Sequence, residues 1–417
     1  MTVLIVGAGA AGLTAAFTLL KENITDFRIL EATDRLGGRL KKLDTFASFP
    51  IDLGGEWIHV DPIVLNRIAQ DNSTLDAIPI VPHVPEEYLV YEGPGEFTTD
   101  LMDTVTPENL TDYLFVDYTW FDFFNDTIAL PQVRDKIVFD CPVTTIQYDS
   151  SSELDGGTNQ TTLDNGVVVA TCANGDTYEG SHILVTASVA VLQKGLITFV
   201  PELPEDYVEA LEAIPMYLGI KMFFKFQQDF YPDVFESEVY PFMFGWDETF
   251  GEQKVEGEHV MGVLVHAPEQ EDADLNQTEL LEYTMEILDT MFDGNATKYL
   301  IDSVIQNWAQ EPYALGSYSA FNDTDWAIEQ FKYPVNATRT TGLPVLFFAG
   351  EAFPATFAEE GNGFAHGAAL SGQETAQWMM EELLGDDGGS DDDGGVGGDD
   401  DDSASSTASI TKTGAVE

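Results

Sequence analysis

The sequence predicts an α/β protein whose principal domain is assembled from distant segments, with a second, α+β domain inserted between them. The first observation is a buried-strand pattern at residues 3–6, which leads through a glycine-rich turn into a helix. The second is a short strand at 344–349 that again leads through a glycine-rich loop into a helix ending near Leu384. Between them, residues 137–187 have the alternating pattern and turn signals of hairpins. This order favours one α/β domain that another domain interrupts.

The glycine-rich turn has the spacing GxGxxG, with Gly7, Gly9 and Gly12 at its glycine positions. The first glycine allows a tight turn, the second lets the backbone approach a diphosphate, and the third lets the helix pack closely on the strand. A second strand, 27–30, ends at Glu31, whose carboxylate is placed to accept hydrogen bonds from ribose hydroxyls. Strand, helix and acid together predict a Rossmann-like dinucleotide-binding domain.

Charge and cysteine content exclude several classes of protein. The 417 residues carry a formal net charge of −56, so binding to nucleic acid is not expected. No apolar run reaches the ~18–20 residues that a membrane span needs. Two cysteines, Cys141 and Cys172, offer no metal cluster, although they could form a disulfide in an oxidising compartment.

The last 33 residues, 385–417, are predicted to form a disordered acidic tail. They include nine Asp and no aromatic residue, and such a composition buries too little apolar surface to order a chain. The tail carries a charge of −9, which leaves −47 on the rest of the chain. The acidity of the body has two explanations: attraction of a cationic substrate such as a polyamine, or solubility.

Asn-x-Ser/Thr sequons are more frequent than composition explains. Nine of the 14 asparagines lie in sequons, whereas about two are expected when roughly one residue in eight is Ser or Thr. We expect a secreted or lumenal glycoprotein, although no targeting segment is visible; the alternative is that Asn and Thr simply cluster in surface loops. The nine are Asn23, Asn72, Asn109, Asn125, Asn159, Asn276, Asn295, Asn322 and Asn336.

Several motifs follow one another in a characteristic order. Besides the glycine turn, they are residues 31–39 (EATDRLGGR), 52–59 (DLGGEWIH), 183–204, 349–351 (AGE) and 362–372 (NGFAHGAALSG). Together they resemble the flavin-dependent amine oxidases, the family that includes polyamine oxidases and monoamine oxidases.

The resemblance implies a two-domain organisation and FAD as the cofactor. No cysteine occurs in 350–361, so the resemblance implies that FAD is bound non-covalently, and it implies no metal. The expected FAD domain comprises 1–60, 135–200 and 345–384, and the substrate domain 61–134 and 201–344. The implied FAD-binding residues are Gly7, Gly9, Ala11, Gly12, Glu31, Arg39, Gly55, Glu56, Trp57, Val143, Glu351, Gly363, Phe364 and Ala365.

Four residues are implied to act on the reaction. Lys221, in the apolar strand pattern 217–226, resembles the family lysine that bonds through water to flavin N5 and assists reoxidation by oxygen; the alternative is a surface lysine. Tyr318 and Phe364 match the two aromatic positions that flank the substrate amine, and the alternative for both is core packing. His59 matches a substrate-contacting histidine of certain polyamine oxidases, or is structural.

The implied reaction is oxidation of a C–N bond of an amine, with a polyamine favoured. Hydride passes from the carbon beside the nitrogen to flavin N5, which yields an imine and then an aldehyde or ketone, and molecular oxygen is reduced to hydrogen peroxide. Two alternatives stay open. One is an L-amino-acid oxidase or related flavin oxidoreductase, which would need an arginine for the substrate carboxylate. The other is a non-catalytic FAD-binding protein.

Overall fold

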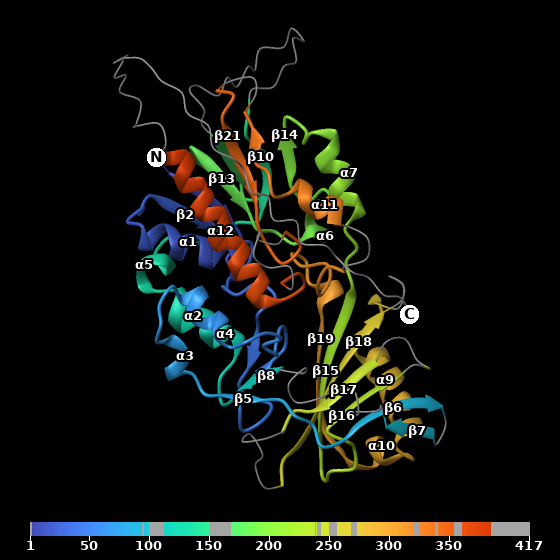
Figure 1. The fold of residues 1–417 in the computed structure, drawn as a ribbon. Helices are drawn as coiled ribbons and strands as arrows, with labels where there is room; N and C mark the ends of the chain where they lie inside the picture. The colour runs from blue at the N-terminus through green and yellow to red at the C-terminus, as the bar shows by residue number, and fades with distance from the viewer. Residues whose placement is uncertain are drawn as a thin grey trace, which may run out of the picture.

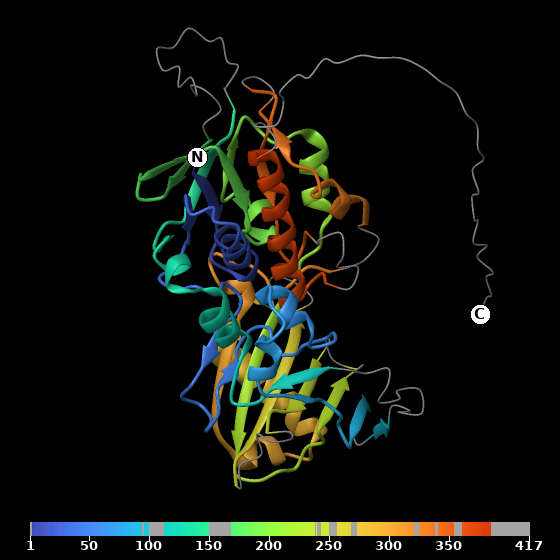
Figure 2. The same cartoon turned by 60° about the vertical axis from the view of Figure 1, so that its left-hand side comes forward.

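The structure, a computed structural model, describes residues 2–93, 96–99, 112–149, 168–237, 239, 243–249, 257–267, 273–320, 325–337, 341–353 and 361–384. The predicted tail and the sequons at Asn109, Asn159 and Asn322 lie outside these residues. Figures 1 and 2 show a six-stranded sheet with its helices in the upper half of the molecule and a seven-stranded sheet in the lower half. Within the described ranges, no helix has the length and apolar character needed to cross a bilayer.

The six-stranded sheet unites strands from both ends of the chain, in the order β20-β21-β13-β1-β2-β9. All neighbours pair in parallel except β20, which is antiparallel to β21 at the edge. The edge strand β20 lies inside 201–344, the range that the sequence assigns to the other domain. The strands are β1 (Val3–Val6), β2 (Phe27–Leu30), β9 (Ile137–Val138), β13 (His182–Val185), β20 (Val335–Asn336) and β21 (Pro344–Phe348).

Alternating side chains of β1 divide the upper core into two layers. Val3 and Ile5 pack with helices α1 (Ala10–Lys21) and α12 (Ala365–Leu384), which lie side by side in Figure 1. Leu4 and Val6 face the opposite side, in a second apolar cluster. This second layer contains a small sheet with the strand order β12-β11-β10-β14 and three helices. Its elements are β10 (Val143–Gln147), β11 (Val168–Cys172), β12 (Thr177–Gly180), β14 (Thr198–Val200), α6 (Val189–Gln193), α7 (Glu205–Ala213) and α11 (Asp325–Gln330).

The seven-stranded sheet has the order β19-β15-β18-β17-β16-β6-β7. On β15, which pairs with β19 and β18, Met222 and Phe224 lie in one core with Leu288 of helix α9 (Gln277–Met291). Lys221 and Phe223 therefore point to the opposite face, since successive residues of a strand alternate. The strands are β6 (Tyr88–Gly93), β7 (Glu96–Thr99), β15 (Leu218–Phe226), β16 (Val234–Ser237), β17 (Met243–Asp247), β18 (His259–Ala267) and β19 (Leu300–Asn307).

Short elements fill the space around these sheets. Two further two-stranded sheets pair β3 with β4 and β5 with β8. These elements are β3 (Lys42–Leu43), β4 (Ile51–Asp52), β5 (Ile80–Pro82), β8 (Tyr113–Phe115), α2 (Val64–Ala69), α3 (Thr74–Ala77), α4 (Trp120–Phe123), a π-helical turn at Phe124–Ile128, α5 (Pro131–Arg134), α10 (Asn295–Tyr299) and a 3₁₀ turn at Trp308–Gln310.

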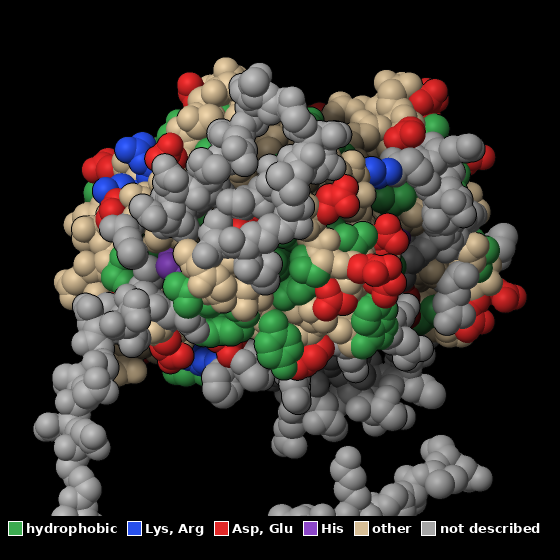
Figure 3. Space-filling view, turned by 90° about the horizontal axis from the view of Figure 1, so that it is seen from above, with side chains coloured by type: hydrophobic (Ala, Val, Ile, Leu, Met, Phe, Trp, Pro, Cys, Tyr) green, Lys and Arg blue, Asp and Glu red, His purple; other side chains and the backbone are tan. Residues whose placement is uncertain are grey.

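Acidic side chains lie on the surface of the folded part of the chain. Figure 3 shows the molecule from above, with Asp and Glu side chains scattered across this face and Lys or Arg in only a few places. On this face, therefore, acidic side chains belong to the described, folded part of the chain and not to one segment.

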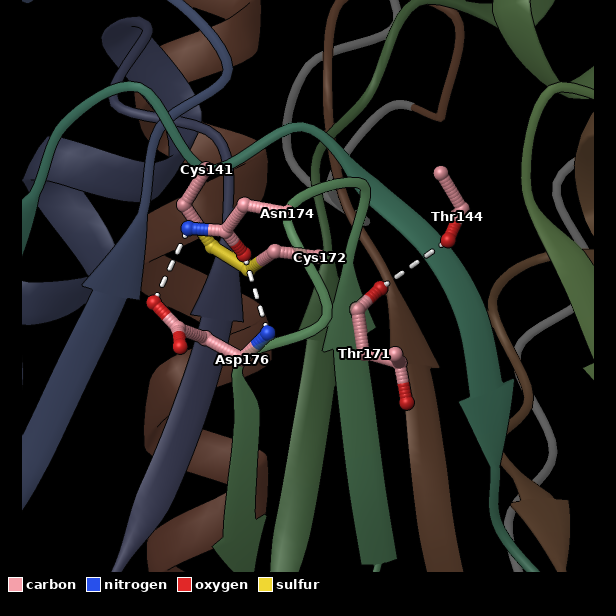
Figure 4. Close-up of a disulfide and its surroundings, with 6 residues drawn as sticks. All are labelled: Cys141, Thr144, Thr171, Cys172, Asn174 and Asp176. Carbon is pink, nitrogen blue, oxygen red and sulfur yellow. Dashed lines mark hydrogen bonds between the residues drawn. A yellow bond between two sulfur atoms is a disulfide. The ribbon is translucent and has the colours of Figure 1, made fainter.

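Cys141 and Cys172 form a disulfide, a pairing that the sequence left open (Figure 4). Their Cα atoms are 5.2 Å apart and both side chains are buried. Cys172 ends β11, and the turn that follows is stabilised by Asn174, whose Oδ1 accepts the Asp176 N–H at 2.9 Å. The crosslink thus fixes the start of β10 to the end of β11.

Replacing both cysteines by serine is expected to lower the free energy of unfolding by about 3–4 kcal/mol. The bond closes a loop across a sequence separation of 31, and its loss restores entropy to the unfolded chain. Urea unfolding measures the change. Thr144→Ala is the matched control, because it removes only the neighbouring hydrogen bond to the Thr171 carbonyl, worth about 1 kcal/mol. Equal losses in the two variants would contradict the assignment.

Candidate active site

The glycine-rich turn after β1 packs against the chain that follows β2. The Gly37 N–H donates to the Ala8 carbonyl at 2.8 Å, and Gly9 and Gly37 form an isolated bridge. Gly7 has a φ of +104°, and a Cβ on Gly12 would lie 2.0 Å from the Gly7 carbonyl oxygen, so both positions require glycine. Helix α1 begins directly after Gly9 with no side-chain cap, so its first N–H groups are placed to bind an anion.

Glu31 directly follows β2, as the sequence predicts, and is buried beside the glycine turn. Its Oε2 accepts the Ala8 N–H at 2.7 Å, and its Oε1 accepts the Thr33 hydroxyl at 2.7 Å. The Cys141 N–H donates to the Glu31 carbonyl at 2.9 Å, which brings the segment leading to Val143 alongside. The carboxylate holds the turn, and Oε2 keeps a lone pair for a further donor.

Arg39 and Glu351 form an ion pair that joins three loops. Arg39 Nη1 donates to Glu351 Oε1 and to the Ser317 carbonyl, each at 2.8 Å. Glu351 Oε2 accepts the Ser319 hydroxyl at 2.5 Å, and the Glu351 carbonyl accepts the Gly363 N–H at 3.2 Å. The loops that follow β2, β19 and β21 therefore meet at one point.

The segment after β4 meets the start of α12. A Cβ on Gly55 would lie 3.7 Å from the Ala365 Cβ, and the rings of His59 and Phe364 are 4.6 Å apart. His59 Nδ1 is 2.9 Å from Asp112 Oδ1. Gly55 and His59 from the first segment thus contact Ala365 and Phe364 from the second. The sequence analysis assigned all four residues to the site.

Lys221 is buried, only 6% exposed, on the face of β15 that lies against residues 52–56. Its Nζ donates to the Asp52 carbonyl at 2.7 Å, to the Gly54 carbonyl at 3.0 Å and to Glu56 Oε2 at 2.5 Å. An ammonium has three N–H donors, so all three are used by protein acceptors. The alternative of a surface lysine is wrong, because the alternation of β15 turns this side chain inward.

Two more carboxyl groups lie in the interior near Lys221. Burial raises the pKa of Asp52 well above its usual range; its Oδ2 accepts the Trp120 N–H at 3.2 Å, and its Oδ1 has no hydrogen-bond partner in the described part of the chain. Burial, followed by the charge of Glu56, likewise raises the pKa of Glu248. More carboxyl groups therefore lie near Lys221 than one ammonium could balance if all of them were ionised.

Tyr318 lies in an aromatic group with two residues that the sequence analysis missed. Its hydroxyl is 2.8 Å from His266 Nε2, and the ring of Tyr217 stacks on His266 with centroids 4.5 Å apart and an interplanar angle of 11°. Burial lowers the pKa of His266 to about 4, so its imidazole is neutral at pH 7. A neutral ring nitrogen accepts the Tyr318 hydroxyl without adding a cation.

Comparison with protein-family models identifies the fold and its chemistry. Residues 10–128 and 124–380 match the family described as flavin containing amine oxidoreductase. The chain belongs to this family. It is a flavin-dependent amine oxidase that resembles polyamine oxidases.

Relatives of the family cover nearly the whole chain. Polyamine oxidase 1 of Zea mays is 24% identical over 90% of this chain and 89% of its own length. The peroxisomal N(1)-acetyl-spermine/spermidine oxidase of Bos taurus is 23% identical over 91% of this chain and 94% of its own. Among solved structures, cyclohexylamine oxidase from Brevibacterium oxydans IH-35A aligns with a TM-score of 0.69 at 16% identity, over 92% of this chain and 99% of its own. Putrescine oxidase bound to putrescine aligns with a TM-score of 0.68 at 15% identity, over 91% and 99%.

The site fits the flavin that the family implies. The close approach of Gly9 to Gly37, with no side chain between the turn and the uncapped start of α1, provides a cradle for a diphosphate. Glu31 lies at the end of β2, where the ribose of a dinucleotide binds. In the described ranges, no group of three His, Cys, Asp or Glu residues is arranged to hold a metal ion.

For the other residues that the sequence assigned to the site, the structure shows the position in the fold. Ala11 is buried where α12 crosses α1: a Cβ on Gly372 would lie 2.1 Å from the Ala11 carbonyl oxygen. Val143 is buried in the core that contains the disulfide. Tyr318 and Phe364 are seen in two separate aromatic groups, and a substrate slot between their rings remains a prediction. The individual cofactor contacts remain predictions as well.

Tyr217, His266 and Glu248 carry no sequence motif. His266 is a histidine near the end of an apolar strand, and Glu248 follows a strand in a polar stretch. Only the pairing of β15 with β18, in which Gly219 lies opposite His266, brings His266 near Tyr217. The alternation of a strand would have placed Tyr217 and Lys221 on one face. It could not have identified β18 as the neighbouring strand that carries His266.

Replacing His266 by glutamine is expected to make stability less sensitive to acid. A histidine whose pKa is about 4 in the folded protein and 6.5 when unfolded costs stability as the pH falls from 6.5 to 4, because only the unfolded chain takes up the proton. Urea unfolding between pH 4.5 and 8 should show a shallower acid slope for His266→Gln than for the wild type. Tyr318→Phe, which keeps His266 buried, should retain the wild-type slope. Parallel curves for wild type and His266→Gln would contradict the assigned pKa.

Proposed function

We propose that this protein oxidises a polyamine with non-covalently bound FAD, giving an imine, then an aldehyde, and hydrogen peroxide. The observation that carries the proposal is the burial of Lys221 against residues 52–56, the segment that resembles the family's flavin-facing stretch. When bound, FAD supplies the acceptor for hydride from the carbon beside the amine nitrogen and passes the electrons to molecular oxygen.

The glycine turn and the positive end of α1 would bind the diphosphate, and the free lone pair on Glu31 would accept a ribose hydroxyl. Val143 would line the adenosine side, since the chain before it is bonded to Glu31. Arg39 is only partly buried and would add positive charge beside the diphosphate while Glu351 holds it in place. Gly55, Glu56, Trp57, Gly363 and Ala365 would border the flavin ring, because the two segments that carry them meet.

Three aromatic or imidazole groups would shape the substrate side. Phe364 and His59 are in ring contact, so an amine entering beside them meets an apolar surface and one imidazole. Tyr318 would present its ring face to the nitrogen, with its hydroxyl held by His266. Lys221 would hold water near the flavin and assist reaction with oxygen.

Charge supports a polycationic substrate. A surface with an excess of Asp and Glu raises the local concentration of polyamines and speeds their encounter at low salt. The names of the relatives from Zea mays and Bos taurus point to the same class of substrate. An L-amino-acid oxidase would need an arginine for a carboxylate, but the guanidinium of Arg134 is bonded to the carbonyls of Ala129 and Asn125.

Non-covalent binding is supported by the cysteines. The chain has only two, and both sulfurs are in the disulfide, so no thiol remains to bond a flavin.

The purified protein is expected to be yellow and to release FAD on denaturation. It should form hydrogen peroxide with spermine, spermidine or an acetylated polyamine at a higher kcat/KM than with a monoamine or an amino acid. Raising the salt to about 0.5 M should lower kcat/KM for the polyamine more than for the monoamine, because screening weakens charge attraction. A flavin-loaded protein that oxidises none of these amines would overturn the proposal.

We further propose that the protein is a secreted or lumenal glycoprotein. The disulfide suits an oxidising compartment, and four sequon asparagines are exposed: Asn23, Asn72, Asn276 and Asn336. Expression in a eukaryotic secretory host should give a protein whose mass falls on enzymatic removal of N-glycans. An unchanged mass would contradict glycosylation.

A further inference from the structure

Three carboxyl side chains surround the single ammonium of Lys221 in the interior. Asp52 and Glu248 are 4% and 6% exposed, and Glu56 accepts from Lys221 at 2.5 Å. The rings of Phe223 and Trp246 lie 5.2 and 5.3 Å from Nζ, so this environment is poor in water. Uncompensated charge in such a place costs several kcal/mol, and three ionised carboxylates cannot share one cation.

Among the residues that the structure describes, the neighbouring groups supply no second cation. His83 stacks on Trp57 with centroids 5.2 Å apart, and burial lowers its pKa, so it is neutral at pH 7. Lys42 is bound to Asp122 at 2.7 Å and to Asp44 at 3.1 Å. The cluster must therefore keep protons on some of its carboxyl groups.

The geometry shows which carboxyl group pairs with Lys221 and which keeps a proton. Glu56 makes the ion pair and also accepts the Trp57 indole N–H at 3.1 Å. Glu248 lies just after β17 and is hydrogen-bonded to Glu56. The Trp246 indole N–H donates to Glu248 Oε2 at 2.6 Å, which fixes that oxygen as an acceptor. The other oxygen is then the one that carries a proton toward Glu56.

We propose that Glu248 is a positioning residue for Lys221: it remains protonated and donates its proton in a hydrogen bond to Glu56, which in turn holds the ammonium against the backbone of residues 52–54. Glu248 touches neither substrate nor flavin in this role. The inference rests on the proposed function, in which Lys221 faces the flavin, but the shared proton follows from the packing alone.

The arrangement makes Lys221 sensitive to pH through a group that it does not contact. Two of its three hydrogen bonds go to backbone carbonyls, and only the bond to Glu56 involves a movable side chain. Loss of the Glu248 proton would set two carboxylates against each other, with Asp52 behind them, and would pull the ammonium away from residues 52–54. Only by exchanging one of these bonds can Lys221 donate to a water.

The sign of the pH effect on stability follows from linkage. A carboxyl group whose pKa is higher in the folded protein than its ordinary 4.5 is neutral when folded and ionised when unfolded, so stability falls as the pH rises above 4.5. Glu248→Gln has no proton to lose, yet its amide donates to Glu56 and its oxygen accepts from Trp246. The variant should therefore gain stability relative to the wild type as the pH rises.

The test is urea unfolding of the purified holoprotein between pH 5.5 and 9. The difference in unfolding midpoint between Glu248→Gln and wild type should grow as the pH rises toward the folded-state pKa of Glu248 and level off above it. Glu258→Gln is the matched control: Glu258 directly precedes β18 and binds Lys225 of β15 at 2.9 Å near the surface. Hydrogen bonds from Ser48 and Lys225 outweigh its desolvation and lower its pKa. That variant should be less stable than wild type across the same range.

A second readout separates positioning from simple stability. The rate of flavin reoxidation should fall with rising pH in the wild type and fall less in Glu248→Gln, whereas Glu248→Leu, which cannot donate to Glu56, should be slow at every pH. Parallel stability curves for wild type and Glu248→Gln, or identical pH profiles of reoxidation, would overturn the inference. A wild-type protein inert to every amine would instead overturn the proposed function.

Discussion

The burial of the Lys221 ammonium is the constraint on which the site depends. Its three hydrogen bonds run from β15 of the seven-stranded sheet to Asp52, Gly54 and Glu56, and so fix this sheet against the segment at the end of β4. Breaking a buried ion pair by removing one partner typically costs about 3–5 kcal/mol, because the other charge is left uncompensated. The positions of strand β15, the backbone of residues 52–54 and the side chain of Glu56 therefore depend on one another.

Two further contacts reinforce this junction. The Trp308 indole N–H donates to the Leu53 carbonyl at 2.9 Å, next to the carbonyls that Lys221 uses. Arg39 reaches across to Ser317 and Glu351, and so holds together the loops after three different strands. A site at the meeting of several loops is rigid only if such bonds cross between them, and here each crossing bond is buried or partly buried. Substrate and cofactor would meet a preorganised surface rather than separate loops.

Motifs with local spacing could be predicted from the sequence, and long-range neighbours could not. The glycine turn, Glu31 and the inward lysine follow from spacing, because a turn, a strand end and the alternation of a strand are local properties. The strands 3–6 and 344–349 were expected for the same reason. Their place in one domain was expected from the same strand, glycine-loop and helix order at both ends. The strand order of the sheet, its antiparallel edge strand β20, and the meeting of His266 with Tyr318 depend on strand pairing, which no local pattern specifies.

The net charge could be read from the sequence, but the positions of the buried charged groups could not. Composition indicated an acidic body, but it could not show that three acids lie around one lysine, nor that Glu351 is bound to Arg39. Glu248 accepts the Trp246 indole N–H, and Trp246 packs edge-on against Phe223 of a different strand. Interior acids of this kind are found by locating buried groups and asking which protons they must keep.

The most direct test of the account is the rate at which oxygen reoxidises the reduced flavin in Lys221→Met. Stopped-flow absorbance after anaerobic reduction by a polyamine measures it, with Lys225→Met, on the same face of the same strand, as the matched control. The account predicts that Lys221→Met retains FAD but is reoxidised at least about tenfold more slowly, while Lys225→Met matches the wild type. Reoxidation of Lys221→Met at the wild-type rate, with full flavin content, would contradict the central role of this lysine.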